Sequence, residues 1–148
     1  MNNEITLKNG KIAKIFHTTG IRECPAVPLM LRLYADLIDS GFNLRSALSF
    51  SNSSSMVWLE HDGKVVGGIC FEVWGDSKTH WISFSFTDPE WRAQGINQHC
   101  HNKLEELTRD KEFLYIASLV NVNNKARIAT CEKLGLTPEF YRMSKRVI

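Results

Sequence analysis

The sequence predicts a mixed α/β fold, in which helices flank a central sheet that is mixed and mostly antiparallel. Three observations predict it. Short strand-like segments follow one another across tight turns, the hydrophobic period then changes to that of a helix, and a continuous apolar segment lies between two helical ones. With 148 residues, 43% of them hydrophobic, the chain can bury a sizeable core, so residues 1–148 are predicted to form one domain.

The N-terminal third predicts a hairpin followed by helix. Residues 4–8 and 11–16 flank Asn9-Gly10, a pair that suits a type I′ hairpin turn. Over residues 25–38, Leu29, Leu33 and Leu37 recur every four positions on one helical face, and Gly41 follows as a stop. Residues 43–48 predict a second, shorter helix.

Three strands are expected next. Residues 56–60 and 64–74 flank Asp62-Gly63, the strongest short-range hairpin signal, and residues 75–78 form the following turn. Residues 81–87 alternate strictly. We therefore expect one face of this strand to be apolar and the other hydroxylated, the apolar positions being Ile82, Phe84 and Phe86 and the hydroxyl positions Ser83, Ser85 and Thr87.

The C-terminal part alternates between helix and strand. Ile96, Cys100, Leu104 and Leu107 share one helical face. Residues 113–120 are almost continuously apolar, which is typical of a buried strand in a parallel pair. Residues 124–134 are again helical with Gly135 as the stop, and residues 140–147 predict a last strand.

Composition excludes several classes of function. The net charge is +2 and no basic run occurs, so we expect neither nucleic acid nor a membrane as a partner. No apolar stretch is long enough for a signal peptide or a membrane span. The four cysteines are scattered without a CxxC pair, which is typical of reduced thiols in a cytoplasmic protein. The sequence does not decide whether the chain is a monomer or a homodimer.

The segment with the clearest chemistry is residues 88–97, where the alternating strand meets the amphipathic helix. Gly95 permits a close approach to the backbone, and the start of the next helix offers unpaired N–H groups at the positive end of a dipole. These features predict an anion site, and an ordinary strand-to-helix loop is the alternative.

Arg92-Ala93-Gln94-Gly95-Ile96-Asn97 resembles the (Q/R)-x-x-G-x-(G/A) signature of the GNAT acyltransferases, with Asn97 departing from it at the last position. Two further segments are similar to the same family. One is Asn124-Lys125-Ala126 followed by Cys131-Glu132-Lys133-Leu134-Gly135-Leu136, and the other is the hairpin Asp62-Gly63-Lys64 that leads into the glycines at 67 and 68. The matches cover residues 56–136 in the family's order. The resemblance implies a GNAT-like acyl-CoA N-acyltransferase fold.

The resemblance also implies how acetyl-CoA is bound as cosubstrate. The backbone of one strand would hold the pantetheine arm where two parallel strands separate, around Phe86 and Leu114, and Asn124 would contact the same arm. Backbone N–H groups of the following turn would hold the pyrophosphate, with a basic side chain beside them. The cofactor-binding residues so predicted are Ser85, Phe86, Thr87, Arg92, Ala93, Gln94, Gly95, Ile96, Asn97, Gln98 and Asn124.

The resemblance further implies direct transfer of an acetyl group to a primary amine in a ternary complex, with a strand N–H holding the oxyanion. The family's usual acid, a tyrosine seven residues after the asparagine, is here Cys131, which either donates the proton to sulfur or is a small packing residue. Trp81 and Ser83 stand where the family often has a base. Glu72 is the favoured substitute, ahead of Asp76 and His80 near the same turn, and a water chain is the alternative.

No metal is expected, because His99 and His101 lie two apart on a helix and therefore point in nearly opposite directions. Lys125, Arg127 and Lys133 are either contacts for the 3′-phosphate of CoA or solvated charges. The predicted function is that of an N-acetyltransferase. A catalytically weak module that binds CoA or a partner is the alternative, and an acyl group other than acetyl stays open.

Overall fold

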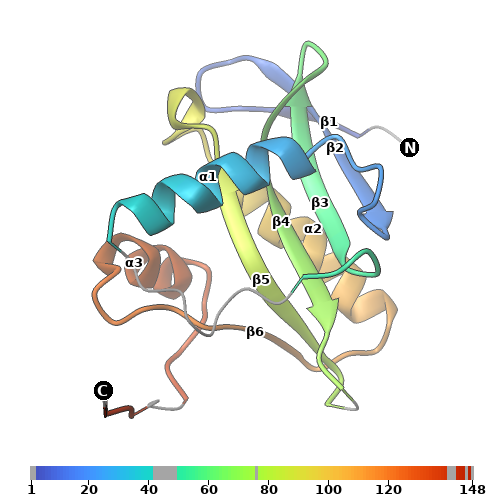
Figure 1. Ribbon diagram of the computed structural model, residues 1–148. Helices are drawn as coiled ribbons and strands as arrows, with labels where there is room; N and C mark the ends of the chain where they lie inside the picture. Colours follow the sequence, from blue (N-terminus) through green and yellow to red (C-terminus); the bar gives the residue numbers. More distant parts are fainter. Residues whose placement is uncertain (1–2, 42–49, 76, 140–142, 146, 148) are drawn as a thin grey trace.

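The computed structural model describes residues 3–41, 50–75, 77–139, 143–145 and 147. Its strands form one sheet in the order β1-β2-β3-β4-β5-β6, which is antiparallel except for the parallel pair β5–β6 (Figure 1). The strands are β1 (Glu4–Thr6), β2 (Ile12–Thr19), β3 (Ser55–His61), β4 (Lys64–Val73), β5 (Thr79–Thr87) and β6 (Tyr115–Ser118). The helices are α1 (Val27–Asp39), the 3₁₀ turn η1 (Pro89–Trp91), α2 (Ile96–Asp110) and α3 (Lys125–Lys133).

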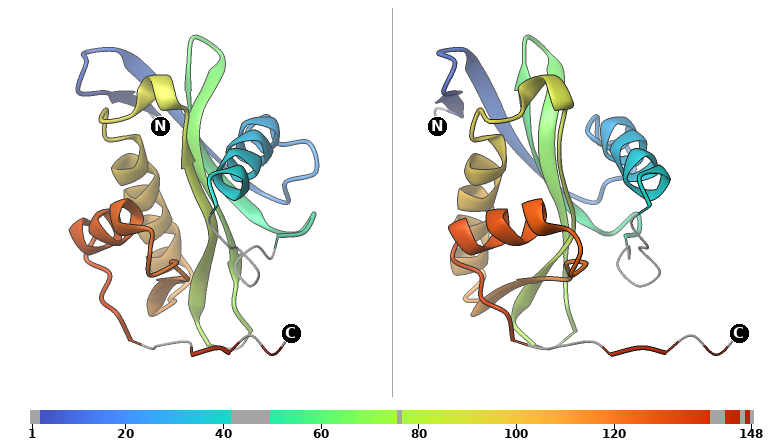
Figure 2. Two further views of the ribbon diagram at one scale, coloured as in Figure 1. Left: turned by 60° about the vertical axis from the view of Figure 1, so that its left-hand side comes forward. Right: turned by 90° about the vertical axis from the view of Figure 1, so that its left-hand side faces the viewer.

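Helices cover both faces of the sheet. Figure 2 shows α1 on one face and both α2 and α3 on the other. The strands between them must bury side chains on both sides, which explains why β3, β4 and β5 are apolar along most of their length. The predicted mixed sheet with flanking helices is therefore confirmed.

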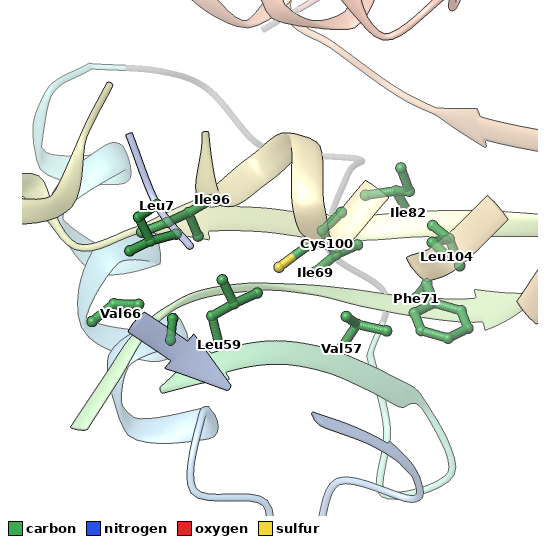
Figure 3. Packing of buried hydrophobic residues seen from close by; sticks show 11 residues of the cluster. Leu7, Val57, Leu59, Val66, Ile69, Phe71, Ile82, Ile96, Cys100 and Leu104 are labelled. Carbon is green, nitrogen blue, oxygen red and sulfur yellow. The ribbon is translucent and has the colours of Figure 1, made fainter. Parts of the chain in front are cut away.

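Each face has its own core. On the α2 face, the side chains of Ile96, Cys100 and Leu104 point from the helix onto those of the strands (Figure 3). The strand residues of this cluster are Val57, Leu59, Val66, Ile69, Phe71 and Ile82. The cluster on the α1 face joins Met30 and Leu33 of that helix to Met56, Trp58, Cys70 and Phe86.

Two adjacent glycines let other groups approach β4. A Cβ atom on Gly67 would lie 2.7 Å from Ile96 Cγ2 of α2 and 2.8 Å from the Phe86 carbonyl oxygen. A Cβ atom on Gly68 would lie 2.7 Å from the Val57 carbonyl oxygen and 2.9 Å from the Phe86 ring. The first turn of α2 therefore rests directly on the β4 backbone, and this contact sets where α2 begins relative to β5.

The tight turns form where the sequence predicts them. Asp62 and Gly63 both have positive φ, 49° and 75°, as a type I′ turn requires. Gly10 has φ of 81°, and the Asn9 side chain accepts a hydrogen bond from the Lys11 N–H. The short turns between these strands keep neighbours in the chain as neighbours in the sheet.

The alternation expected along β5 is wrong at one point. Cys70 lies opposite Phe84, but the next residue of β4, Phe71, lies opposite Ile82, so the register steps over Ser83. A bulge of this kind reverses the direction of every side chain on one side of it. Ile82 consequently packs on the α2 face, whereas Phe84 and Phe86 pack on the α1 face.

The C-terminal predictions need two corrections. β6 spans only Tyr115–Ser118 and is not buried, because it is the edge strand of the sheet and leaves Leu114 and Tyr115 70% and 57% exposed. In the predicted strand 140–147, positions 143–145 and 147 belong to no strand, and within the described part of the chain β6 pairs only with β5. The other positions of that segment, and the helix predicted over 43–48, lie outside the described residues.

Gly67→Ala should destabilise the protein by about 1–3 kcal/mol, because the new methyl group meets backbone as well as the Ile96 side chain. The check is the free energy of unfolding in a denaturant titration. Wild-type stability in this variant would contradict the close contact between α2 and β4.

His80 is a second buried feature of the α2 face, 1% exposed and flanked by the rings of Phe71 and Phe113. The Thr108 hydroxyl donates to the Leu104 carbonyl at 2.6 Å, so it accepts from His80 Nδ1 at 2.8 Å. Burial, followed by repulsion from Lys111 and His17, lowers the pKa of His80 to about 4. The ring is therefore a neutral core residue.

Because the pKa of His80 is lower in the folded than in the unfolded chain, the stability from its neutral ring is complete above pH 6.5 and is lost as pH falls towards 4. We expect the free energy of unfolding to decrease by up to about 3 kcal/mol from this group over that range. His80→Phe should show a smaller decrease, measured by denaturant titrations from pH 7 to 4. Equal slopes in the two proteins would contradict the buried neutral ring.

Candidate active site groove

A groove opens where β5 and β6 stop pairing. The parallel register runs from Thr79–Tyr115 to Ile82–Ser118 and goes no further, although β5 continues to Thr87. Beyond this point lies a cavity of about 400 Å³. Its walls come from α1, β5, the η1 turn, the segment after β6 and the start of α3; they are Leu33, Asp36, Leu37, Ser40, Ser83, Phe84, Ser85, Phe86, Thr87, Pro89, Arg92, Ser118, Leu119, Val120, Asn121, Asn124 and Arg127.

The groove brings together five of the residues predicted to bind the cofactor. They are Ser85, Phe86, Thr87, Arg92 and Asn124, from three separate segments of the chain. The separation of strands lies after Ile82 and Ser118. It does not involve Leu114, whose N–H donates to the Lys78 carbonyl at the closed end of the pair.

The turn between β5 and α2 is held by the buried side chain of Asp88. Its carboxylate accepts from the Glu90 N–H at 3.1 Å, which starts the η1 turn. Arg32 of α1 and Lys64 of β4 lie 3.8 and 3.9 Å from Asp88 Oδ2. A buried carboxylate thus has two cations beside it, and together they hold the turn against both neighbours.

The start of α2 has the geometry of an anion site. Ala93 and Gly95 have φ of 63° and 80°, and the first helical bond in this turn runs from the His99 N–H to the Gly95 carbonyl. The N–H groups of residues 96–98 therefore have no intrahelical acceptor. The Lys8 side chain from the first hairpin passes next to Gly95, its Cε 3.7 Å from where a Cβ atom would be. None of Ala93–Gln98 lines the groove itself; these residues directly follow Arg92, which does.

The side chain of Asn97 points back towards the sheet. Its Oδ1 accepts from the Ser85 hydroxyl at 2.8 Å, which ties the first turn of α2 to the groove wall. The one position that departs from the family signature therefore holds a side chain that contacts β5.

Asn124 and Arg127 carry the α3 wall of the groove. Asn124 Oδ1 caps α3 by accepting from the Arg127 N–H at 3.1 Å, which leaves its amide nitrogen as a donor. Cys131, one turn further along, is 7% exposed and is not part of the groove lining. The helical spacing that makes Asn124 and Cys131 share a direction holds, but the groove ends before it reaches the thiol.

Glu72 also lies outside the groove lining. It stands opposite Trp81 in the β4–β5 register, and the Trp81 ring contacts that of Trp74 at 5.0 Å between centroids. Trp74 is 58% exposed, so this group forms an open surface next to the groove. His80 is buried on the opposite face of the sheet, and Asp76 lies outside the described residues.

Some groove residues were not predicted as site residues. Asp36 projects from α1, where the helical pattern marks only the apolar face. Ser118 lies in the segment 113–120 that the sequence predicts to be a buried strand, and Asn121 directly follows it. Arg127 is predicted to be either a contact for the 3′-phosphate of CoA or a solvated charge; it lines the groove, and burial lowers the pKa of its guanidinium. Of these residues, only Arg127 could have been predicted to line the groove, because it follows Asn124 by one helical turn.

No group of three potential ligands suited to a metal ion occurs among the described residues, and no helix in that part of the chain could cross a bilayer. His101 is buried with Nε2 3.5 Å from Glu105 Oε1, and burial lowers the pKa of both His99 and His101.

The model of the acetyltransferase (GNAT) family matches residues 23–136 of the chain. A comparison of the sequence with curated proteins finds no match.

Solved structures with a similar fold include an aminoglycoside acetyltransferase, meta-AAC0020, from an uncultured soil metagenomic sample, in complex with sisomicin. It is 16% identical, with a TM-score of 0.70 over 92% of this chain and 95% of that one. The aminoglycoside N-acetyltransferase AAC(6′)-Iy in complex with CoA is 14% identical, with a TM-score of 0.66 over 90% and 98%. A ribosomal-protein-alanine N-acetyltransferase from Brucella melitensis biovar Abortus 2308 is 12% identical, with a TM-score of 0.68 over 90% and 98%.

Gly95→Val should weaken acetyl-CoA binding about tenfold or more, because a branched side chain at φ of 80° forces the turn to change. Gly75→Val is the matched control, since Gly75 also has positive φ but lies in the β4–β5 turn with open space around it. Isothermal titration calorimetry measures both affinities. Equal affinities would contradict the assignment of an anion site to this turn.

Proposed function

The chain belongs to the GNAT family of acetyltransferases, and on that premise we propose that it transfers the acetyl group of acetyl-CoA to a primary amine by direct attack in a ternary complex. The observation that carries the proposal is the groove between β5 and the segment after β6, with the start of α2 next to it. Such a groove offers an unpaired strand edge and an anion site to one extended ligand.

The strand edge suits the pantetheine arm. Among the described residues no strand pairs with the β6-facing side of Ser85, Phe86 and Thr87, so their backbone can bind an extended amide chain as an added strand would. Asn124 lies across the groove, and its side-chain nitrogen is the donor left after its oxygen caps α3. The two walls together would fix the position of the thioester.

The start of α2 suits the pyrophosphate. Backbone N–H groups within Ala93–Gln98 would donate to the phosphate oxygens, as the dipole of a 15-residue helix favours an anion at this end. Arg92 on the groove and Lys8 beside Gly95 add two positive charges. A local site of this kind needs no basic surface, in keeping with a net charge of only +2.

In the proposed reaction a neutral amine attacks the thioester carbonyl carbon, a nitrogen–carbon bond forms and the carbon–sulfur bond breaks. A backbone N–H on the free edge of β5 would hold the oxyanion. The amine also loses a proton. Asp36 is the carboxylate that α1 contributes to the groove, and it would accept this proton. Glu72 as base and Cys131 as acid stay predictions, and neither lines the groove.

A catalytically weak module that binds CoA is the second candidate. It is favoured by the side chains at three positions where this family often has catalytic groups, namely Trp81, Ser83 and Cys131. The fold and the groove suit both candidates, so only turnover separates them.

We expect the protein to release free CoA thiol from acetyl-CoA when an amine is present, because the groove has a free strand edge and an anion site. The measurement is a thiol-release assay with a panel of polyamines, amino acids, aminoglycosides and peptides. Tight CoA binding without turnover on any amine would favour the binding module. Gly95→Val, which should bind acetyl-CoA poorly, is the control for release that does not depend on the site.

A further inference from the structure

Two indole rings lie together next to the groove, and one of them is largely exposed. Trp74 follows the end of β4, Trp81 lies in β5, and their ring centroids are 5.0 Å apart with the planes tilted by 45°. Trp74 is 58% exposed and Trp81 is half-buried, and neither ring belongs to a core cluster. Indole rings that stay in contact with water are typical of surfaces that bind another molecule.

The pair lies on the α1 face of the sheet. The two neighbours of Trp81 in β5 both face α2, because His80 contacts Thr108 and Ile82 packs in the cluster on the α2 face. Side chains alternate along a strand, so Trp81 faces the opposite side. Figure 1 shows α1 crossing β4 and β5 at a distance from the turn that joins them, and the indole pair lies towards that turn.

A carboxylate lies beside the indole pair. Glu72 stands directly opposite Trp81 in the register of β4 and β5, and residues paired in this way have neighbouring side chains on one face. Phe71, the residue before Glu72, packs in the cluster on the α2 face, so Glu72 faces α1 by the same alternation. None of the ion pairs among the described residues includes Glu72. We call Glu72, Trp74 and Trp81 the Trp–Glu patch.

The Trp–Glu patch continues the groove along β5. Ser83 and Phe84 line the groove, and Trp81 precedes Ser83 by two positions, roughly 7 Å along the strand. Phe84 contacts Tyr34 of α1 edge-on, with ring centroids 5.7 Å apart, so this part of the groove wall lies on the same face as the patch. A molecule bound in the groove on the α1 side can therefore extend over the patch.

The charged residues on the two sides of the groove have opposite signs. Its basic lining residues are Arg92, next to the start of α2, and Arg127 of α3, and Figure 2 shows both helices on one face of the sheet. Its acidic lining residue is Asp36 of α1, on the other face, where Glu72 also lies. In the proposed function the anionic cofactor binds next to the start of α2. The α1 side is then complementary to a cationic acceptor.

We propose that the acceptor is a diamine, and that the Trp–Glu patch binds its second, unreacting ammonium group. This inference rests on the proposed acetyl transfer and names the class of its acceptor. One nitrogen lies in the groove and receives the acetyl group, and the other stays charged beside Glu72 and the indole rings. A cation is attracted to the face of a tryptophan ring, and a carboxylate adds a charge-assisted hydrogen bond. The step of roughly 7 Å from Ser83 to Trp81 favours nitrogens separated by several carbon atoms.

This role assigns different tasks to the two carboxylates on the α1 face. A general base has to lie at the reacting nitrogen, and of the two only Asp36 lines the groove. Glu72 lies outside the lining, where it can hold a charge that belongs to a more distant part of the acceptor. Glu72 is thus a specificity residue, and its removal should affect which amine is used.

The test compares kcat/KM for 1,5-diaminopentane and for n-hexylamine, in which a methyl group replaces the second ammonium group. The wild type should prefer the diamine at least about tenfold, since the methyl group forms neither contact. Glu72→Gln and Trp74→Ala should each lower this preference about three- to tenfold by raising the KM for the diamine. Trp74→Phe should retain more of the preference than Trp74→Ala, because it keeps an aromatic face.

A control variant and a binding measurement accompany the assay. Glu23→Gln removes an exposed carboxylate that belongs neither to the patch nor to the groove lining, and it should keep the wild-type preference. Isothermal titration calorimetry of 1,5-diaminopentane into the protein with CoA bound should show weaker binding in Glu72→Gln and Trp74→Ala. The KM for acetyl-CoA should change less than about twofold in every variant, because the patch lies away from the start of α2.

Equal kcat/KM for the two amines in the wild type would overturn the diamine as acceptor and leave the acetyl transfer intact. An equal loss on both amines in Glu72→Gln or Trp74→Ala would also overturn it, by showing a structural role only. So would a change of oligomeric state in Trp74→Ala with the preference unaltered, since the patch would then be a contact between copies of the chain. Absence of turnover on every amine, with CoA bound, would overturn the acetyl transfer, and the calorimetry would still decide whether the patch binds a diamine.

Discussion

The early end of the β5–β6 pairing is the constraint on which the rest of the site depends. Four residues of each strand form the parallel ladder, and β5 then continues to Thr87 while it stays paired with β4 on its other side. Its free edge would be a liability on an ordinary surface, since unpaired backbone groups attract other strands. Here the edge lies in a groove whose walls include residues of α1 and α3.

Side chains on both faces of β5 are buried, while the edge of the strand lies along the groove. The bulge at Ser83 reconciles these demands, because it directs Ile82 into the α2 core and Phe84 and Phe86 into the α1 core. Gly67 lets the first turn of α2 lie on β4, and Asn97 ties that turn to Ser85 on β5. The anion site and the strand edge are therefore parts of one rigid arrangement.

Local charges and net charge have separate roles in this protein. Asp88 is neutralised by Arg32 and Lys64, and its function is to hold the turn after β5. Arg92 lines the groove next to the start of α2, and Arg127 of α3 is a second basic residue of the lining. A chain of net charge +2 can thus present a positive interior to an anionic ligand while its surface stays nearly neutral.

The sequence by itself determined the order of most of the described elements, the Asp62-Gly63 turn and the glycine turn before α2, and it marked Arg92 and Asn124, which both line the groove, because each follows from local preferences or from a short motif. It did not determine which face of the sheet each apolar side chain of β5 packs on. Strict alternation predicts a single apolar face, and the bulge that changes this arises only from pairing with β4. Nor did it place Arg127 on the groove and Cys131 behind it. That difference arises from how α3 lies across the groove from β5, an arrangement of distant segments that no local pattern encodes.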